Sequence, residues 1–482
     1  MTTPEPPPLD DGLVAIVKRE CPTCALVAPV LGALAEAGEA VTVFSQDDPS
    51  FPPGVRVLDD RQLEVSYRLG LTTVPTLLRV EGGREVERTE GWDRTEWERL
   101  SRRQGLGPSL PPFRPGCGSR SVEPGVAEEL TARFSNVLGA RRIEAGALED
   151  EAEFFFARGW TDGLPVVPPT PARVLRMLEG TTRAADEVVA VVPPDLVPCT
   201  VEKVAINAVM AGCRPEYLPV VLAAVEAACG DAFNGHGLLA TTWFAGPVVV
   251  VNGPIAQRIG MNAGGNCLGQ GNRANACIGR ALQLVIRNVG GGRPGEVDRA
   301  TLGNPGKYTF CFAEREEDSP WEPLATERAG LPAGTSAVTL FAGSGVQGIA
   351  DQLSRTPESL ARSFAACLRV NFHPKFVIAS DAMLVVSPEH GRVFRDAGWT
   401  KARLREELDR LLLIPGAEVV QGAGGIAEGL PDRFAGATLP KFRPGGLLIV
   451  HAGGTAGLFS AVIGGWVSGE LGSEPVTKEV TA

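Results

Sequence analysis

The feature that most constrains the fold lies near the N-terminus, where an apolar run leads into a cysteine pair and then into a helical pattern. Leu13–Lys18 is rich in β-branched residues, and Cys21 and Cys24 follow it, separated by Pro22 and Thr23. The apolar side chains that then recur at helical spacing are Leu26, Val27, Val30, Leu31 and Leu34. The pattern predicts a strand, then a helix whose N-terminus is at or just after Cys21.

Further strands and a closing helix are predicted over the next part of the chain. Ala40–Ser45 is a second apolar run, and Thr76–Gly82 and Gly83–Gly91 form a predicted hairpin around a glycine pair. The segment 93–105 has helical character and ends at Gly105. Residues 10–105 are therefore predicted to form one α/β domain.

Two short motifs in this domain resemble the thioredoxin-like family. They are Cys21-Pro22-Thr23-Cys24 after the first strand and Val74-Pro75-Thr76 before a later strand. The resemblance implies a thioredoxin-like fold in which Pro75 is a cis-proline that faces the cysteine pair. Glu20 stands where the family often has Trp, and Ala15 stands near the place of a frequent buried Asp. These departures favour a dedicated reaction with one partner over general disulfide reduction.

The cysteine pair has a physical reason to be redox-active. Free N–H groups and the positive end of the dipole at a helix N-terminus stabilise a thiolate and lower the pKa of the first cysteine. Cys21 would then attack a disulfide, and Cys24, one helical turn away, would resolve the mixed disulfide. An inert pair is the alternative, and zinc is disfavoured because the chain has no second Cys-x-x-Cys.

Residues 106–125 are rich in Pro, Gly and Ser and are predicted to be a linker. Cys117 lies between Gly116 and Gly118, and we expect its thiol to be flexible and exposed. It could exchange with Cys21 and Cys24 as a relay toward the rest of the chain, or it could have no role.

The remainder, residues 126–475, is predicted to be a large α/β or α+β layered domain, with two lobes split near 330–350 as the alternative. No convincing internal repeat is evident. Strands are predicted at 247–252, 337–343, 375–380, 382–387 and 447–453. The apolar segment Gly446–Trp466 is interrupted by glycines and is predicted to be a strand, a loop and a helix, not a membrane span.

The most site-like run of this domain is 260–280, where glycines and asparagines would let the backbone approach a ligand. Arg273 leads into a predicted helix whose N-terminus could hold an anion, although a capped structural loop is the alternative. The substrate-binding candidates are Asn207, His236, Asn262, Arg273, Asn275, Lys307 and Tyr308.

Glu314 and Glu316 are alternate residues after a predicted strand and could point together, with Cys311, toward a pocket. Paired carboxylates suit general acid/base catalysis, and a solvated acidic turn is the alternative. The catalytic candidates in this domain are Cys213, Cys311, Glu314 and Glu316, and the cysteines that could receive electrons are Cys213, Cys267, Cys277 and Cys311. None of the four histidines has a metal-site spacing, so we expect no His-based metal site and assign no metal ligands. A cluster of Cys213, Cys311 and a carboxylate is the alternative that the sequence leaves open.

Several runs between about 110 and 470, including "GWTDGLPVVPPT" and "NRANACIGRAL", resemble a poorly characterised bacterial family associated with Sec-Gly-Ser-Cys (UGSC-type) selenoproteins. In place of that motif the chain has Cys117-Gly118-Ser119-Arg120. The resemblance brings no catalytic residues to carry over.

Composition limits the class of partner. The net charge of -11 excludes a general nucleic-acid or anionic-membrane binder, which needs a concentrated basic face. The N-terminus lacks the basic and apolar regions of a signal peptide, and ten scattered cysteines favour reduced thiols in the cytoplasm. We expect a small-molecule substrate, a cellular thiol reductant and possible homo-oligomers, with no cofactor beyond a redox-active Cys21–Cys24 disulfide.

The resulting hypothesis is a fusion enzyme in which a thioredoxin-like module supplies reducing equivalents to a fused catalytic domain that binds a small molecule. One alternative is a thiol-dependent lyase that cleaves a carbon–heteroatom or carbon–metal bond. Another is a redox-switched carrier or assembly protein without turnover.

Overall fold

The computed structural model shows a mixed α/β protein whose sheets contain strands of both orientations. The residues that it describes are 8–135, 137–143, 146 and 150–481. The chain divides into two compact units, Met1–Leu138 with Pro171–Leu175, and Gly139–Thr170 with Arg176–Ala482.

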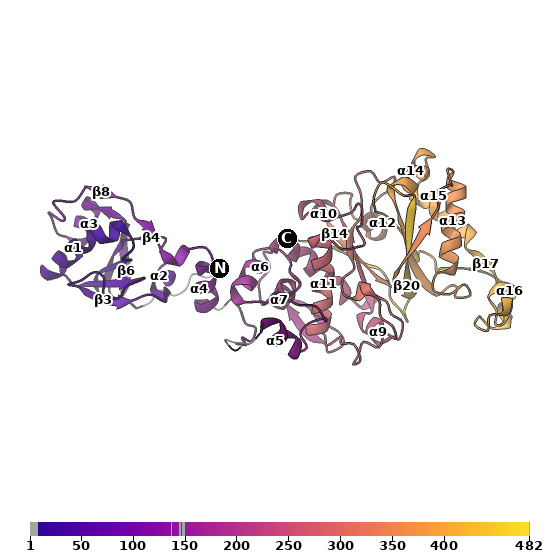
Figure 1. Ribbon diagram of the computed structural model, residues 1–482, viewed down its shortest axis with the longest axis horizontal. Helices are drawn as coiled ribbons and strands as arrows, with labels where there is room; N and C mark the ends of the chain where they lie inside the picture. The colour runs from indigo at the N-terminus through magenta and orange to yellow at the C-terminus, as the bar shows by residue number, and fades with distance from the viewer. Residues whose placement is uncertain (1–7, 136, 144–145, 147–149, 482) are drawn as a thin grey trace. The chain divides into compact units, whose positions relative to one another are not determined.

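The first unit is built on one five-stranded sheet of order β3-β2-β1-β5-β6 (Figure 1). β1 pairs in parallel with β2 and β2 with β3, while β5 and β6 form an antiparallel hairpin on the other side of β1. Its elements are β1 Gly12–Val17, α1 Pro22–Glu36, β2 Val41–Ser45, β3 Arg56–Asp59, α2 Glu64–Arg68, β4 Thr73–Val74, β5 Thr76–Glu81, β6 Arg84–Glu90, β7 Trp92–Asp93, α3 Arg94–Ser101, β8 Phe113–Arg114, β9 Cys117–Gly118 and α4 Val126–Phe134. The predicted strands, the hairpin and the helix after the cysteine pair are confirmed.

Apolar periodicity explains how α1 is positioned. Val27, Leu31 and Leu34 are buried in the core of the first unit, and the central strand β1 is buried along almost its whole length. Pro22 occupies the first turn, where the N–H that proline lacks would have no helical partner. The cysteine pair is thereby held at the end of β1 by the burial of the helix that follows it.

The residues predicted to be a linker belong to the first unit. The division falls after Leu138, later than the expected boundary in 106–125. β8 pairs with β7 and β9 pairs with β4, so the segment 113–118 is held against the unit by backbone hydrogen bonding. Trp92 Nε1 donates to the carbonyl of Pro111 at 2.6 Å, which fixes the preceding turn.

The second unit contains two four-stranded sheets that share a core. The sheet orders are β13-β12-β14-β21 and β15-β20-β16-β19. Its larger elements are α5 Glu151–Ala157, α6 Pro171–Leu178 (shared with the first unit), β10 Val188–Val192, β11 Val197–Thr200, α7 Val201–Ala211, α8 Leu218–Ala228, α9 Gly235–Ala240, β12 Gly246–Asn252, α10 Pro254–Arg258, α11 Arg273–Asn288, β13 Cys311–Ala313, α12 Leu324–Ala329, β14 Ala337–Gly343, β15 Val346–Ala350, α13 Pro357–Val370, β16 Ser380–Val386, α14 Pro388–Asp396, α15 Lys401–Leu411, β17 Leu413–Pro415, α16 Gly416–Val419, β18 Thr438–Pro440, β19 Leu447–His451, β20 Phe459–Val467 and β21 Val476–Glu479.

These elements form four layers. Side chains such as Val250, Phe341, Met383 and Ile463 join the two sheets in one apolar cluster. α8 and α11 lie against the first sheet, and α13, α14 and α15 bury their apolar faces against the second (Figure 1). The chain passes from the first sheet to the second between β14 and β15, within the region where a split into lobes was expected, but both sheets belong to one compact unit.

The two sheets repeat the same local topology, which was not evident in the sequence. β12 is followed by α10 and α11, returns as the parallel strand β13, and pairs antiparallel with β14. β16 is followed by α14 and α15, returns as the parallel strand β19, and pairs antiparallel with β20. The sequence-based expectation of no internal repeat was therefore wrong at the level of topology.

Two predicted elements of the second unit are wrong. Residues 375–379 are not a strand, because Ile378 adopts a positive φ angle of 65° that a strand cannot contain, and the strand β16 begins only at Ser380. The end of Gly446–Trp466 forms the strand β20 and not a helix. A Cβ at Gly465 would lie 2.3 Å from the carbonyl oxygen of Asp381, so glycine there permits close approach of β16.

Among the described residues, no single helix is long and apolar enough to cross a membrane. One bent pair, Pro215–Ala228 with Asp231–Ala240, satisfies the length and composition criteria together.

Candidate functional site

Cys21 caps the N-terminus of α1, as the helical spacing predicts. Its side chain accepts a hydrogen bond from the backbone N–H of Cys24 at 3.4 Å, and its sulfur lies 3.5 Å from the carbonyl oxygen of Val74. Cys24 lies one turn further on, is fully buried, and its sulfur accepts a hydrogen bond from the N–H of Lys18. The Val74–Pro75 peptide bond is cis, as the resemblance implies, and the carbonyl of Val74 faces the Cys21 sulfur.

The pKa values of Cys21 and Cys24 are shifted in opposite directions. The pKa of Cys21 is lowered to about 5, chiefly by a hydrogen bond from the Cys24 thiol, with further hydrogen bonds from Cys117 and from backbone N–H groups. Burial raises the pKa of Cys24 well above its ordinary value, and its hydrogen bond to Cys21 adds to this effect. At neutral pH Cys21 is therefore the thiolate and Cys24 the thiol, as attack and resolution require.

Cys117 lies against this pair, contrary to the expectation of a flexible and exposed thiol. Its sulfur is 2.8 Å from the sulfur of Cys21, it is half-buried, and neither cysteine is in a disulfide. Burial raises the pKa of Cys117, and its hydrogen bond to Cys21 acts in the same direction. A covalent disulfide has a sulfur–sulfur distance of about 2.05 Å, so the two thiols are in contact but not bonded.

The neighbouring residues on both sides of Cys117 are also held in place. Thr23 Oγ1 donates to the carbonyl of Pro115 at 2.8 Å, and Lys18 Nζ donates to the carbonyl of Gly118 at 2.9 Å. Gln46 Nε2 donates to Ser119 Oγ at 2.7 Å, from a fully buried side chain. These contacts come from the loop before α1, from α1 itself and from the end of β2, so the position of Cys117 depends on the whole fold of the unit.

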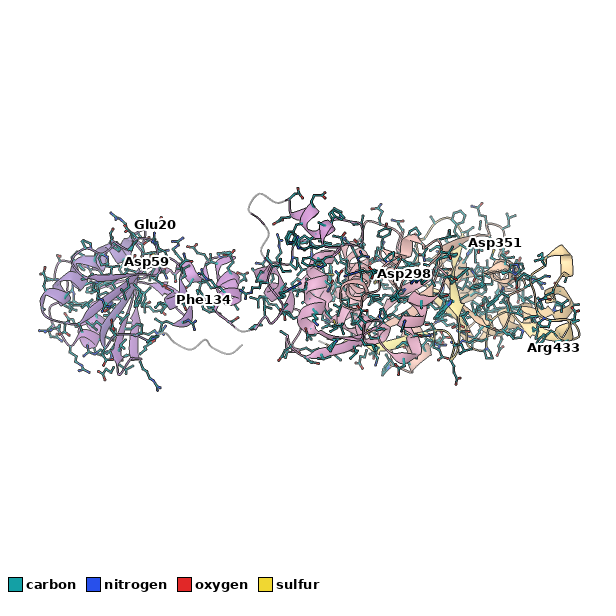
Figure 2. The ribbon with its side chains drawn as sticks, turned by 90° about the horizontal axis from the view of Figure 1, so that it is seen from below. Glu20, Asp59, Phe134, Asp298, Asp351 and Arg433 are labelled. Atoms are coloured by element: carbon teal, nitrogen blue, oxygen red, sulfur yellow. The ribbon has the colours of Figure 1, made fainter. Side chains whose placement is uncertain are left out.

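The positions that depart from the family pattern surround the site without entering it. Glu20 is exposed at the edge of the first unit (Figure 2) and its backbone N–H donates to Asp47. Ala15 is buried in the middle of β1, paired with Val43 and Leu77.

In the second unit the structure brings the predicted carboxylates together. The Nδ2 group of Asn252, at the end of β12, donates to Glu314 at 2.6 Å and to Glu316 at 2.9 Å. Glu314 also accepts from the backbone N–H of Leu324 at 2.7 Å, and Glu316 from that of Gly253 at 2.7 Å. The two carboxylates are thus a hydrogen-bonded junction between strand ends and the start of α12.

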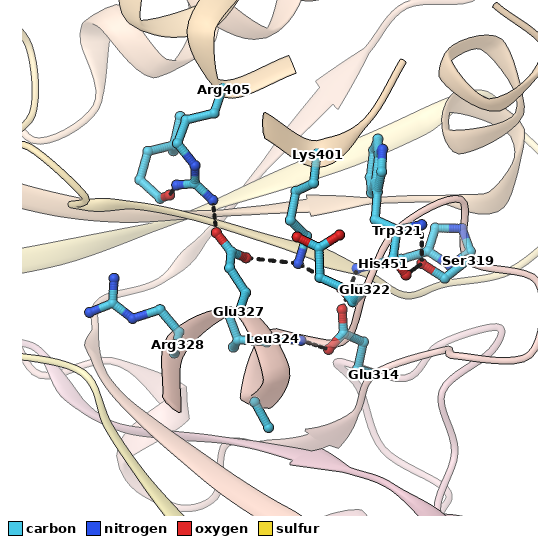
Figure 3. Close-up of polar contacts among 12 residues, drawn as sticks. Glu314, Ser319, Trp321, Glu322, Leu324, Glu327, Arg328, Lys401, Arg405 and His451 are labelled. Carbon is cyan, nitrogen blue, oxygen red and sulfur yellow. Dashed lines mark hydrogen bonds and ion pairs between the residues drawn. The ribbon is translucent and has the colours of Figure 1, made fainter. Parts of the chain in front are cut away.

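Glu314 is buried, and burial raises its pKa despite the nearby charge of Lys401 and several hydrogen bonds. Figure 3 shows Glu314 beside His451, whose backbone N–H faces one carboxylate oxygen at 3.4 Å. Burial lowers the pKa of His451, whose Nδ1 bonds the carbonyl of Arg315 at 2.9 Å. The Lys401 ammonium is itself buried and pairs with Glu327 at 2.9 Å, so a satisfied polar network surrounds the carboxylate.

The predicted loop 260–280 is organised internally. Asn275 is buried and both donates to and accepts from the backbone of Asn262, and it donates to the carbonyl of Cys267. The side chain of Asn262 bonds Gly264 and Gly265 of the same loop. Arg273 Nε donates to the carbonyl of Gly212 at 2.9 Å. These residues therefore satisfy one another, which matches the structural-loop alternative.

The other substrate-binding candidates do not converge. Asn207 is buried and links α7 to α11 through Asn288. His236 is exposed on α9, and Tyr308 is 47% exposed. Lys307 pairs with Asp298 at 2.6 Å and lines a cavity of about 20 Å³, which is room for about one water molecule.

Three cysteines of the second unit are close neighbours. Cys213 follows Gly212 at the end of α7, where a Cβ on Gly212 would lie 3.5 Å from the Cys277 sulfur. Burial raises the pKa of Cys213 well above its ordinary value, with smaller effects from the nearby Cys277 and Cys311. Burial likewise raises the pKa of Cys277 and of Cys311, and it raises the pKa of Cys267 to about 11. Cys267 belongs to the 260–280 loop and is buried in the apolar cluster between the two sheets. All four are protonated at neutral pH.

Within the described parts of the chain, no group of three or more His, Cys, Asp or Glu side chains is arranged to hold a metal ion.

Sequence reasoning missed the residues that hold Cys117 in place. Gly116 approaches β4 so closely that a Cβ would lie 2.4 Å from Thr73 and 2.7 Å from the carbonyl oxygen of Val74. The glycines beside Cys117 were the available signal, but they were interpreted as flexibility. In the second unit Asn252 and His451 were also missed, since neither lies in a recognisable motif.

Comparison with protein-family models gives no match, and comparison with curated proteins gives no significant similarity. The functional argument therefore rests on the geometry of the chain itself.

Proposed function

We propose that the chain is a thiol–disulfide oxidoreductase whose first unit is a thioredoxin-like module, with Cys21 as the attacking thiolate and Cys24 as the resolving thiol. The observation that carries this proposal is the placement of Cys21 as the N-cap of α1, where its sulfur accepts the Cys24 N–H and lies 3.5 Å from the carbonyl of Val74. The pKa shifts of the cysteines agree with this placement. All ten cysteines are described, and Cys21 alone has a lowered pKa, while burial is the chief cause that raises the pKa of the other nine.

The arrangement around Cys21 supports each step of an exchange. Nucleophilic attack by the Cys21 thiolate on a substrate disulfide forms a mixed disulfide and releases one substrate thiolate, which takes up a proton. Cys24, one helical turn away, then attacks the Cys21 sulfur and releases the second substrate thiol. The carbonyl of Val74 lies beside the reacting sulfur, where an extended substrate chain can pair.

We further propose that the second unit is the catalytic partner that receives the reducing equivalents. Fusion in one chain supports this role, because a tether of moderate length raises the effective concentration of one module at the other. The neighbouring Cys213 and Cys277 are the candidate acceptors, since a substrate can oxidise one of two nearby thiols to a sulfenic acid, or the pair to a strained disulfide, that the first unit would reduce.

The test is dithiothreitol-dependent reduction of insulin by the full-length chain. Cys21→Ser should abolish turnover, and Cys367→Ser, which changes a half-buried thiol of the second unit, should leave it intact. Turnover that persists in Cys21→Ser would refute the assignment. For the second unit, peptide mapping of the Cys24→Ser/Cys117→Ser chain after mild oxidation should find Cys213 or Cys277 linked to Cys21, and the absence of any such link would refute the transfer between units.

A further inference from the structure

The strand β9 occupies the edge of β4, where a substrate chain would be expected to pair. Val74 lies opposite Cys117 and Thr73 opposite Gly118 in an antiparallel register. The N–H of Ser119 extends this ladder by donating to the carbonyl of Thr72 at 2.9 Å. A cysteine-bearing extended segment of the same chain is therefore bound beside the reactive sulfur, in the geometry of strand addition.

We propose that residues 113–119 are an internal substrate of Cys21, and that Cys117 forms a disulfide with Cys21 that closes the site to external disulfides. This inference rests on the proposed function of Cys21 and specifies its first exchange partner. The two sulfurs are already 2.8 Å apart, and Cys21 as a residue is only 1% exposed with Cys117 beside it.

The chemistry balances when an external disulfide is the oxidant. The Cys21 thiolate attacks glutathione disulfide, forms a mixed disulfide and releases one glutathione thiol. The Cys117 thiol then attacks the Cys21 sulfur, a Cys21–Cys117 disulfide forms, and the second glutathione leaves with the proton. Cys24 can finally displace Cys117, which gives the Cys21–Cys24 disulfide and returns the Cys117 thiol without further oxidation.

The glycines on either side of Cys117 provide a matched pair of variants. A Cβ at Gly116 would collide with Thr73 and with the Val74 carbonyl, so Gly116→Ala must push the segment away from β4. A Cβ at Gly118 would meet nothing within 4 Å, so Gly118→Ala leaves the segment in place. Both variants keep all ten cysteines, and they differ in whether Cys117 can remain beside Cys21.

The experiment uses the full-length Cys24→Ser chain, which cannot complete the normal resolution. The reduced protein is exposed to glutathione disulfide, quenched with an alkylating agent, and mapped by peptide mass spectrometry. We expect a Cys21–Cys117 disulfide, release of two glutathione thiols per chain, and a short-lived glutathione adduct on Cys21. In Cys24→Ser/Gly116→Ala the adduct should persist at least about tenfold longer, since the second thiol is no longer pre-positioned. Cys24→Ser/Gly118→Ala should behave as Cys24→Ser.

The outcomes separate this inference from the proposed function. If the Gly116 and Gly118 variants accumulate the same adduct and Cys117 remains free in all chains, the internal substrate is refuted while the reactivity of Cys21 stands. If Cys21 acquires neither glutathione nor a protein disulfide in any chain, both proposals fail. Cys24→Ser/Cys117→Ser provides a second variant without added bulk. It should accumulate the adduct, and rapid loss of the adduct there would overturn the role of Cys117.

Discussion

Replacing Cys24 by alanine should raise the pKa of Cys21 by a predictable amount. The hydrogen bond from the Cys24 thiol is the main contribution that lowers the pKa of Cys21 to about 5. A hydrogen bond to a charged group contributes about 1.5–3 kcal/mol, and about 1.4 kcal/mol corresponds to one pKa unit. Cys24→Ala should therefore move the Cys21 titration from about pH 5 to about pH 6–7.

Thiolate absorbance in the ultraviolet measures this titration directly. The pKa values of the other nine cysteines are raised, so absorbance that appears below pH 7 reports Cys21 alone. Direct titration is preferable to an alkylation rate, because Cys21 is only 1% exposed and because a thiolate becomes intrinsically more nucleophilic as its pKa rises.

The matched control is Cys24→Ser, which keeps an O–H donor near the Cys21 sulfur and should move the midpoint less than alanine does. A midpoint that stays near pH 5 in Cys24→Ala would refute the argument that this hydrogen bond governs the thiolate. If the midpoint of the Cys21 titration moved equally in Cys24→Ser and Cys24→Ala, this argument would also be refuted. The change in pKa would then come from altered solvation of Cys21 and not from loss of the hydrogen bond.

Other predictions concern stability and the loop of the second unit. Trp97 is fully buried and its Nε1 donates to the Gly91 carbonyl at 3.0 Å, so Trp97→Ala should lower the unfolding free energy by about 3–5 kcal/mol in urea titrations. Burial lowers the pKa of His451, so the stability that its neutral form contributes is present above the unfolded pKa of about 6.5 and is lost as the pH falls through the folded value. His451→Asn should therefore show a smaller fall in unfolding free energy than the parent between pH 7 and 5. Asn275→Ala removes three hydrogen bonds of a buried side chain and should speed proteolytic cleavage within 262–272, whereas an unchanged cleavage rate would contradict the conclusion that Asn275 holds this loop in place.

The sequence predicted the elements whose signal is local. The strand before Cys21, the helix after it and the β5–β6 hairpin follow from apolar periodicity and turn residues in adjacent parts of the chain. The predicted strand at 375–380 failed because a tertiary contact decides its path. Lys375 is buried and donates to the carbonyls of Val420 and Ile426 at 2.8 Å each, which no local pattern reveals.

In the candidate site, too, only the features set by neighbouring residues could be predicted from the sequence. The position of Cys21 at a helix N-terminus could be predicted, because capping and helical spacing are properties of neighbouring residues. The position of Cys117 could not, since it depends on pairing between β4 and β9 across more than forty intervening residues. Glu314 and Glu316 could be expected to act together, but Asn252, which joins them, could not be identified from its own sequence context.

The ionisation of Cys21 also constrains the acceptor that the module can reduce. A thiol pKa of about 5 in place of 9.0 stabilises the reduced pair at pH 7 by about 3 kcal/mol, which raises its reduction potential by about 60 mV. The Cys21–Cys24 pair is therefore a weaker reductant than an unperturbed dithiol. An acceptor in the second unit must have a still higher potential, as a sulfenic acid or a strained disulfide has, and a relaxed structural disulfide would remain oxidised. Because Cys213 and Cys277 are protonated at neutral pH and gain no such stabilisation when reduced, transfer to them is favourable only after a substrate has oxidised one of them. The proposed fusion thus requires oxidation in the second unit to precede electron transfer from the first.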